Sequence, residues 1–277
     1  QRVYREYDAS SINDIPVEVF YKELARYQPL VNNAKEAFAD PKTGMAPGVM
    51  GLTAEDMQNF YSQLPKRLKS VIWLEQSGKP GYEQAQAIAQ KKFDAVQKPF
   101  TYSFGVSSDA MDYQTLLSLL LTLLCAVIAA PVFASDAQTG AQDIQLCTKN
   151  GGLRLAAAKL AAAFSITGAA YLLCGVVWIL VTNALFGWES TQTSVQWLFS
   201  VTSLLPYTVG QMEWVMLVAN FLIFFAEVAF VLMASVWAKN NLTALSVALI
   251  SVVAQLIVYM VVPGSFGEWL STLIPAG

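Results

Sequence analysis

A long run without charge constrains this chain more than any other feature. From Tyr113 to Ala134, twenty-two residues follow one another without a Lys, Arg, Asp or Glu. A helix needs about 20 such residues to cross a hydrocarbon core of about 30 Å. Three further apolar stretches follow, at Leu160–Phe186, Glu213–Ala238 and Leu242–Val262. The pattern predicts an all-α fold, a polytopic membrane helical bundle over residues 113–277.

The charged residues are concentrated before this bundle. Residues 1–112 hold 13 of the 17 Lys and Arg residues and 14 of the 20 Asp and Glu residues. This segment is therefore predicted to be a small, mostly helical domain outside the bundle. Its helices are expected from an N-cap at Thr53, from Pro65 to Ser77 and over 81–98. Its nearly balanced charge excludes the basic surface that nucleic-acid binding requires.

The few basic residues of the bundle predict its orientation. Lys149, Arg154 and Lys159 lie in or beside the connection over residues 135–159, and Lys239 lies in the tight turn before the fourth stretch. Basic residues in short loops stay on the cytoplasmic side. We therefore expect these connections inside the cell and residues 1–112 outside, as an extracellular domain.

Two apolar segments on the external face are too short to span. Residues 195–210 suit an interfacial or re-entrant element with Trp188, Trp197 and Trp214 at headgroup depth, although a loop helix packed on the bundle explains them equally well. Residues 264–277 form an external amphipathic element.

The placement of residues 1–112 outside the cell requires a segment that carries them across. The chain opens on Gln1, without a signal peptide or a spanning helix before the external domain. We therefore expect a fragment that lacks a first spanning helix, and a further spanning helix after Gly277.

The composition excludes several kinds of chemistry. The chain has no His and three Cys residues, Cys125, Cys147 and Cys174, whose spacing matches no metal site. His-dependent catalytic triads are excluded as well. We expect no catalytic residue, no metal ligand and no cofactor bound by this chain, with the cysteines acting as small apolar residues.

One carboxyl group lies in the middle of a predicted membrane helix. Glu227 is costly there and should face protein or water. Asn220 on the same helix, and Asn183 and Gln255 on neighbouring helices, are candidate hydrogen-bond partners. The sequence leaves two roles open for Glu227, a neutral structural group or a part in substrate passage or proton handling.

The connection between the first two membrane helices carries the clearest pattern. It contains a Phe, an acidic residue three positions later, a Gly, a short apolar stretch, a basic turn and a Lys that opens the next helix, which here are Phe133, Asp136, Gly140, Ile144, Leu146, Lys149, Arg154 and Lys159. This order resembles the segment between the second and third spanning helices in permeases of the type-two class of ATP-binding-cassette (ABC) exporters. Asp136 stands where Glu is commoner in that family.

The resemblance implies a permease subunit in the cytoplasmic membrane of a bacterium, which exports a drug, peptide or lipid. Residues 135–159 would be its coupling loop, in which a short helix with Asp136, Asp143, Lys149 and Arg154 around Ile144 and Leu146 docks on an ATPase. No Walker A motif occurs in the chain, so ATP and magnesium would be bound by separate ABC ATPase subunits. A second permease copy or homologue and membrane lipids are the other implied partners.

Two alternatives stay open from the sequence. The chain could be a non-transporting membrane sensor or scaffold whose extracellular helical domain receives a signal, and its basic residues could act only as topology signals. A membrane-embedded enzyme is disfavoured, because no pair of intramembrane carboxylates and no Ser/Lys dyad is visible.

Overall fold

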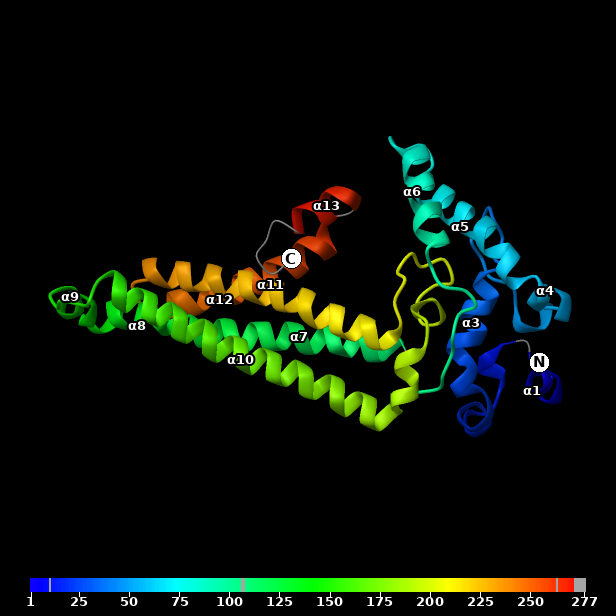
Figure 1. Cartoon of the computed structure of the whole chain (residues 1–277), viewed down its shortest axis with the longest axis horizontal. Helices are drawn as coiled ribbons and strands as arrows, with labels where there is room; N and C mark the ends of the chain where they lie inside the picture. The colour runs from blue at the N-terminus through cyan, green and yellow to red at the C-terminus, as the bar shows by residue number, and fades with distance from the viewer. Residues whose placement is uncertain (10, 106–107, 263, 272–277) are drawn as a thin grey trace. The chain divides into compact units, whose positions relative to one another are not determined.

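The structure is a computed structural model that describes residues 1–9, 11–105, 108–262 and 264–271 (Figure 1). These residues form helices and turns, with one isolated β-bridge between Ser194 and Thr208. The all-α prediction is therefore confirmed for this part of the chain. The chain divides into two compact units. Unit 1 comprises Gln1–Met111 and Thr182–Met212, and unit 2 comprises Asp112–Val181 and Glu213–Gly277.

Short helices and single turns build unit 1. Its longest helices are α3 (Gln28–Glu36), α5 (Phe60–Gln76) and α6 (Tyr82–Asp94). The shorter elements are α1 (Arg2–Glu6), η1 (Ile12–Asp14), α2 (Val17–Val19), η2 (Phe20–Leu24), η3 (Ala25–Tyr27), η4 (Val49–Gly51), α4 (Ala54–Gln58), η5 (Trp188–Gln192) and η6 (Val195–Trp197).

Helix α5 continues through Pro65, where the sequence predicts a break. Proline removes one backbone hydrogen bond and disfavours a helix interior. The loss is offset by a stripe of buried side chains at four-residue spacing, Phe60, Leu64, Leu68 and Ile72, which belongs to the main core cluster of unit 1. The predicted N-cap is confirmed, since the Thr53 hydroxyl accepts a hydrogen bond from the Asp56 N–H at 3.1 Å.

The segment between the second and third long apolar helices also belongs to the core of unit 1. The Trp197 ring stacks on the Phe60 ring with centroids 5.3 Å apart. Trp197 is 7% exposed and Val201 is fully buried. Trp197 is therefore enclosed by protein, whereas Trp188 and Trp214 are exposed. Whether residues 195–210 form an interfacial or re-entrant element or a packed loop stays a prediction.

Side chains of α3 fix this segment through its backbone. The Asn33 Nδ2 group donates to the Trp197 carbonyl at 2.7 Å. The Glu36 carboxylate accepts from the Ser200 hydroxyl at 2.7 Å and from the Val201 N–H at 3.0 Å. Residues more than 160 positions apart in the sequence therefore form one core.

Long apolar helices build unit 2. Its elements are α7 (Ser108–Ala129), α8 (Pro131–Thr139), α9 (Ala141–Leu146), α10 (Leu153–Phe186), α11 (Val209–Trp237), α12 (Asn241–Val261) and α13 (Gly264–Ser271).

Three runs within these helices are long and apolar enough to cross a membrane, Ala110–Thr139, Leu153–Phe186 and Val209–Trp237. The fourth predicted span falls on α12, whose apolar part is described only over Asn241–Ala254 and is shorter. It stays a prediction. The external element predicted over 264–277 forms α13 up to Ser271, and its last six residues lie outside the described chain.

The predicted loop over residues 135–159 is mostly helical. Helix α8 runs on to Thr139, α9 follows, and α10 begins at Leu153 instead of Leu160. The sequence LRLAAAK of residues 153–159 is made of strong helix formers, which explains the earlier start. At about 1.5 Å per residue, the 34 residues of α10 measure about 51 Å, well over the hydrocarbon thickness.

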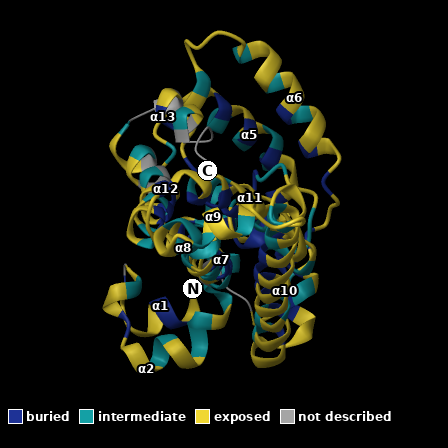
Figure 2. Cartoon of the chain, turned by 90° about the vertical axis from the view of Figure 1, so that its left-hand side faces the viewer, coloured by how far each residue is buried: buried dark blue, intermediate teal, exposed yellow. Residues whose placement is uncertain are grey.

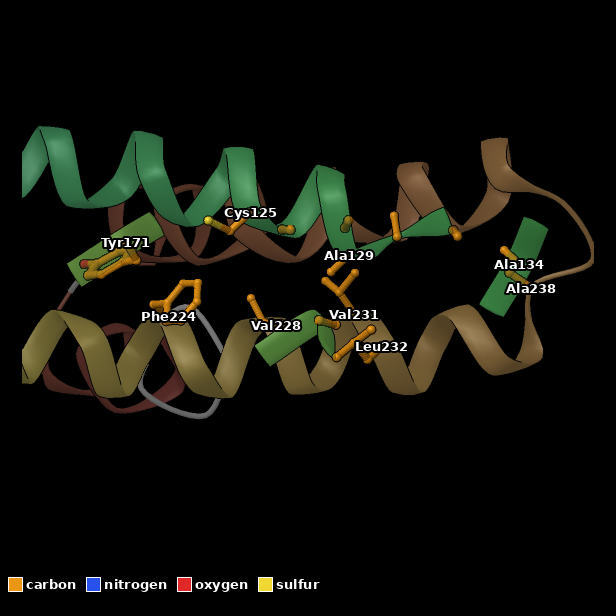
Figure 3. Packing of buried hydrophobic residues seen from close by; sticks show 14 of the residues in the cluster. Cys125, Ala129, Ala134, Tyr171, Phe224, Val228, Val231, Leu232 and Ala238 are labelled. Atoms are coloured by element: carbon orange, nitrogen blue, oxygen red, sulfur yellow. The ribbon is translucent and has the colours of Figure 1, made fainter. Parts of the chain in front are cut away.

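Small residues and stacked aromatic rings form the core of unit 2 (Figure 3). On α7, Ala126 and Ala129 are fully buried. The rings of Tyr171 on α10 and Phe224 on α11 stack with centroids 4.6 Å apart. At Gly175 an added Cβ would lie 2.4 Å from a Leu217 methyl group, so glycine allows α10 and α11 to approach closely.

Candidate functional site

One end of unit 2 gathers the basic residues of the bundle. The connection between α8 and α10 lies there, and so does the turn between α11 and α12 (Figure 1). The backbone N–H of Asn241 donates to the Gln138 side-chain oxygen at 3.0 Å, which holds this turn against the end of α8. We call this region the charged end. It carries Lys149, Arg154, Lys159 and Lys239.

A proline kink begins the charged end. Pro131 has no N–H, and the helix divides there into α7 and α8. The Ser235 hydroxyl of α11 accepts hydrogen bonds from the backbone N–H groups of Phe133 at 3.1 Å and Ala134 at 3.0 Å. It donates to the Ala130 carbonyl at 2.6 Å. One buried hydroxyl therefore satisfies three backbone groups at the kink and ties α8 to α11.

An ion pair joins α8 to α10. The Lys159 ammonium contacts the Asp136 carboxylate, and it also donates to the Val132 carbonyl at 3.3 Å. It lies 5.6 Å from the centroid of the Phe133 ring. About four-fifths of each charged side chain is buried, since 20% of Asp136 and 22% of Lys159 is exposed. Three of the predicted coupling residues, Phe133, Asp136 and Lys159, therefore meet at one place.

The other predicted coupling residues lie farther along the connection. Gly140 ends α8 with a φ of 73°, a left-handed conformation that glycine adopts without strain. On α9, Ile144 and Leu146 are 72% and 60% exposed, and Asp143 is exposed as well. Exposed basic residues follow, Lys149 and Arg154, of which Arg154 donates to the Asn150 side chain at 3.2 Å. The short helix is thus smaller than predicted, because Asp136 lies on α8, Arg154 lies on α10 and Lys149 lies between α9 and α10.

A groove of about 740 Å³ opens at this end between the α8–α9 segment, α10 and α11. Its polar part contains Asp136, Lys159, Gln142 and Gln145. Most of its remaining lining is apolar and comes from α10 and α11, including Leu160, Phe164, Leu232 and Met233.

Glu227 lies on α11 away from the groove lining and is completely buried. Its Oε1 atom accepts a hydrogen bond from the Ser251 hydroxyl of α12. Its Oε2 atom has no hydrogen-bond partner among the described side chains. Of its expected partners, Asn220 donates instead to the Ser118 hydroxyl at 3.2 Å. The Gln255 side chain lies outside the described residues, and contacts of Asn183 and Gln255 with Glu227 stay predictions.

Sequence reasoning missed Ser235, Ser251 and Gln138. Ser235 and Ser251 are single polar residues in apolar stretches, whereas Gln138 lies in a polar stretch. The partner of each lies on another helix. The two serines could have been found as polar residues inside predicted membrane helices, because such a group needs a hydrogen-bond partner within the protein.

The charged end is suited to binding and to transmitting motion. Its contacts tie α8 to both α10 and α11, and its exposed side chains include apolar and charged ones. Among the described residues no group of three His, Cys, Asp or Glu side chains could hold a metal ion. Comparison of the chain with protein-family models, with curated proteins and with solved structures gave no match.

Proposed function

We propose that this chain is the permease subunit of an ATP-driven ABC exporter in the cytoplasmic membrane of a bacterium. The observation that carries the proposal is the junction of Phe133, Asp136 and Lys159 at the end of three long apolar helices. These are the residues through which the sequence resembles type-two exporter permeases. The exported substrate belongs to the drug, peptide or lipid class.

The contacts of the charged end suggest how movement would pass from a partner to the membrane helices. Asp136 links α8 to α10 through Lys159, and Ser235 links α8 to α11. A partner that displaces α9 would pull on α8 through the turn at Gly140 and move α10 and α11 with it. The exposed residues Asp143, Ile144, Lys149 and Arg154, which we call the coupling surface, would contact that partner.

The partner in this proposal is an ABC ATPase subunit that binds ATP and magnesium. A second permease copy or a homologue would complete the transporter, as two ATPase subunits act together. The charged end would face the cytoplasm, as the positions of its Lys and Arg residues favour. Residues 1–112 would lie outside the cell, and α12 would be the fourth span.

Charge exchange at the ion pair tests the proposal. Asp136→Lys should place two positive charges together and reduce the amount of co-purifying ATPase, identified by its Walker A motif and by ATP hydrolysis, at least tenfold. The exchange of both residues, Asp136→Lys with Lys159→Asp, should restore most of it. Lys79→Glu, on the exposed surface of unit 1, is the control. Equal ATPase recovery in all variants, or none with the unaltered chain, would contradict the proposal.

The alternative function is a non-transporting sensor or scaffold whose receptor is unit 1. It is favoured by a cavity of about 420 Å³ in that unit, whose lining is partly apolar and also contains the polar side chains of Asp56, Gln63, Lys66, Arg67 and Ser70. In that case the partner recovered through the charged end would have no Walker A motif and would not hydrolyse ATP.

A further inference from the structure

The groove at the charged end changes in character along its length. The ion pair of Asp136 and Lys159 and the amides of Gln142 and Gln145 supply its polar part. Leu160 and Phe164 of α10 and Leu232 and Met233 of α11 belong to its apolar part. A pocket with this division fits a molecule with a charged head and a long apolar chain.

The apolar part extends toward the middle of the membrane helices. Phe164 lies five residues beyond Lys159 along α10, a rise of about 7.5 Å. Its ring stacks on the Phe225 ring of α11 with centroids 4.4 Å apart. Helices α10 and α11 both contain a membrane-length apolar run. The groove therefore leads from the charged end into the region where acyl chains surround the helices.

The polar part has capacity for a phosphate group. An ammonium group has three donors, and Lys159 directs hydrogen bonds to Asp136 and to the Val132 carbonyl. Its third N–H donor and the side-chain amide N–H groups of Gln142 and Gln145 are of the kind that donates hydrogen bonds to phosphate oxygens. Because Asp136 balances the charge of Lys159, a phosphate here would be held by hydrogen bonds from these donors and not by net charge.

We propose that the groove is a binding site for one membrane phospholipid, with an acyl chain along the apolar part and the phosphate beside Lys159. Its volume of about 740 Å³ lies in the usual range for ligand pockets, roughly 300–1,000 Å³. The site does not depend on the exporter function, because it requires only that α10 and α11 lie in a bilayer.

Native mass spectrometry of the full chain, released from nanodiscs, tests this site. The unaltered chain should retain one phospholipid. Ala156→Trp on α10 and Ala229→Trp on α11 place a large ring in the groove from opposite walls, and each should lower the retained fraction at least tenfold. Ala158→Trp and Ala226→Trp are matched controls, since these alanines are exposed and do not line the groove. Both controls should retain the lipid.

Nanodiscs of phosphatidylglycerol and of phosphatidylethanolamine distinguish an anionic from a zwitterionic headgroup. Both carry the phosphate, so retention of either in the unaltered chain, with loss in the groove variants, supports the site. Loss of lipid from the controls as well, equal retention in all variants, or retention of detergent only would overturn it. The two groove variants lie on different helices, so the test still works if one of them fails to fold. The experiment needs no ATPase, so a negative result would not count against the exporter proposal.

Discussion

The two units differ in which side chains form the interior and which form the surface. Unit 1 carries its charges on the surface and encloses an aromatic core around Phe60 and Trp197. The long helices of unit 2, such as α10, have many exposed residues (Figure 2). Many of the exposed side chains of unit 2 are apolar, such as the 65% exposed Leu222 on α11. Its interior is distinguished instead by small residues and by paired Ser, Thr and Gln side chains. Burial in lipid removes the hydrophobic difference between the two faces, so close packing and interhelical hydrogen bonds have to specify the bundle.

The aromatic core of unit 1 gives the largest expected effect. Trp197→Ala removes the ring that stacks on Phe60 and should destabilise unit 1 by about 3–5 kcal/mol. Faster hydrogen–deuterium exchange of α5 in the full chain measures it. Trp73→Ala is the matched control on α5, because 49% of that side chain is exposed. If both variants exchange alike, the segment of Trp197 does not belong to this core.

A charge placed on the outer surface of each unit tests whether the surface of unit 2 faces lipid and that of unit 1 faces water. Leu222→Arg on α11 and Ile88→Arg on α6 alter side chains that are 65% and 57% exposed. If Leu222 faces lipid, the arginine should make the free energy of membrane insertion about 2.5–3.5 kcal/mol less favourable. At Ile88, in water, the change in free energy should be close to zero. The fraction of chain integrated into membranes measures the difference. Equal integration of the two variants would show that the surface at Leu222 does not face lipid.

The kink at Pro131 depends on one hydroxyl. Ser235→Ala leaves the Phe133 and Ala134 N–H groups without that partner. It should destabilise unit 2 by about 0.6–1.7 kcal/mol, from the average to the largest value for interhelical hydrogen bonds in membranes. Unfolding in mixed micelles of increasing denaturing detergent measures the loss. Ser246→Ala is the control, since that hydroxyl donates to the Leu242 carbonyl of its own helix. A loss as large for Ser246→Ala would argue against the tie between α8 and α11.

The smallest effect is a pH dependence confined to unit 1. The Thr53 N–H and hydroxyl donate to the Asp56 carboxylate and hold its pKa below the ordinary value of 3.8. A carboxyl with a lowered native pKa stabilises the fold above its unfolded pKa, and this contribution is lost as the pH falls through the native pKa.

Helix α4 should therefore exchange its amide hydrogens faster as the pH is lowered from above 3.8, after correction for intrinsic exchange rates. Asp56→Asn should remove this dependence, and Glu55→Gln should preserve it. A dependence that survives in Asp56→Asn would assign it to another group.

Local patterns predicted much of this architecture. The apolar runs predicted the three helices that are long enough to cross a membrane, and Thr53 predicted the start of α4. Both signals depend on neighbouring residues. The early start of α10 could also have been read from the alanines before Lys159, because their helix propensity is local.

Contacts between distant residues could not be predicted in the same way. Trp197 reaches the core beside Phe60, and Ser235 reaches the kink about a hundred residues earlier in the chain. No spacing in the sequence connects these pairs. The sequence predicted Asp136 and Lys159 only as two members of one motif. The structure adds that their side chains are in contact.

The proposed function places residues 1–112 and the charged end on opposite sides of the membrane, and this proposed placement can be tested directly. The exposed native Cys147 marks the charged end, and Lys79→Cys places a thiol on the exposed surface of unit 1. Cys125 and Cys174 are replaced by Ala. In intact cells a membrane-impermeant maleimide should label position 79 and leave Cys147 unlabelled until the membrane is permeabilised. Labelling of both positions before permeabilisation, or of Cys147 alone, would contradict the account.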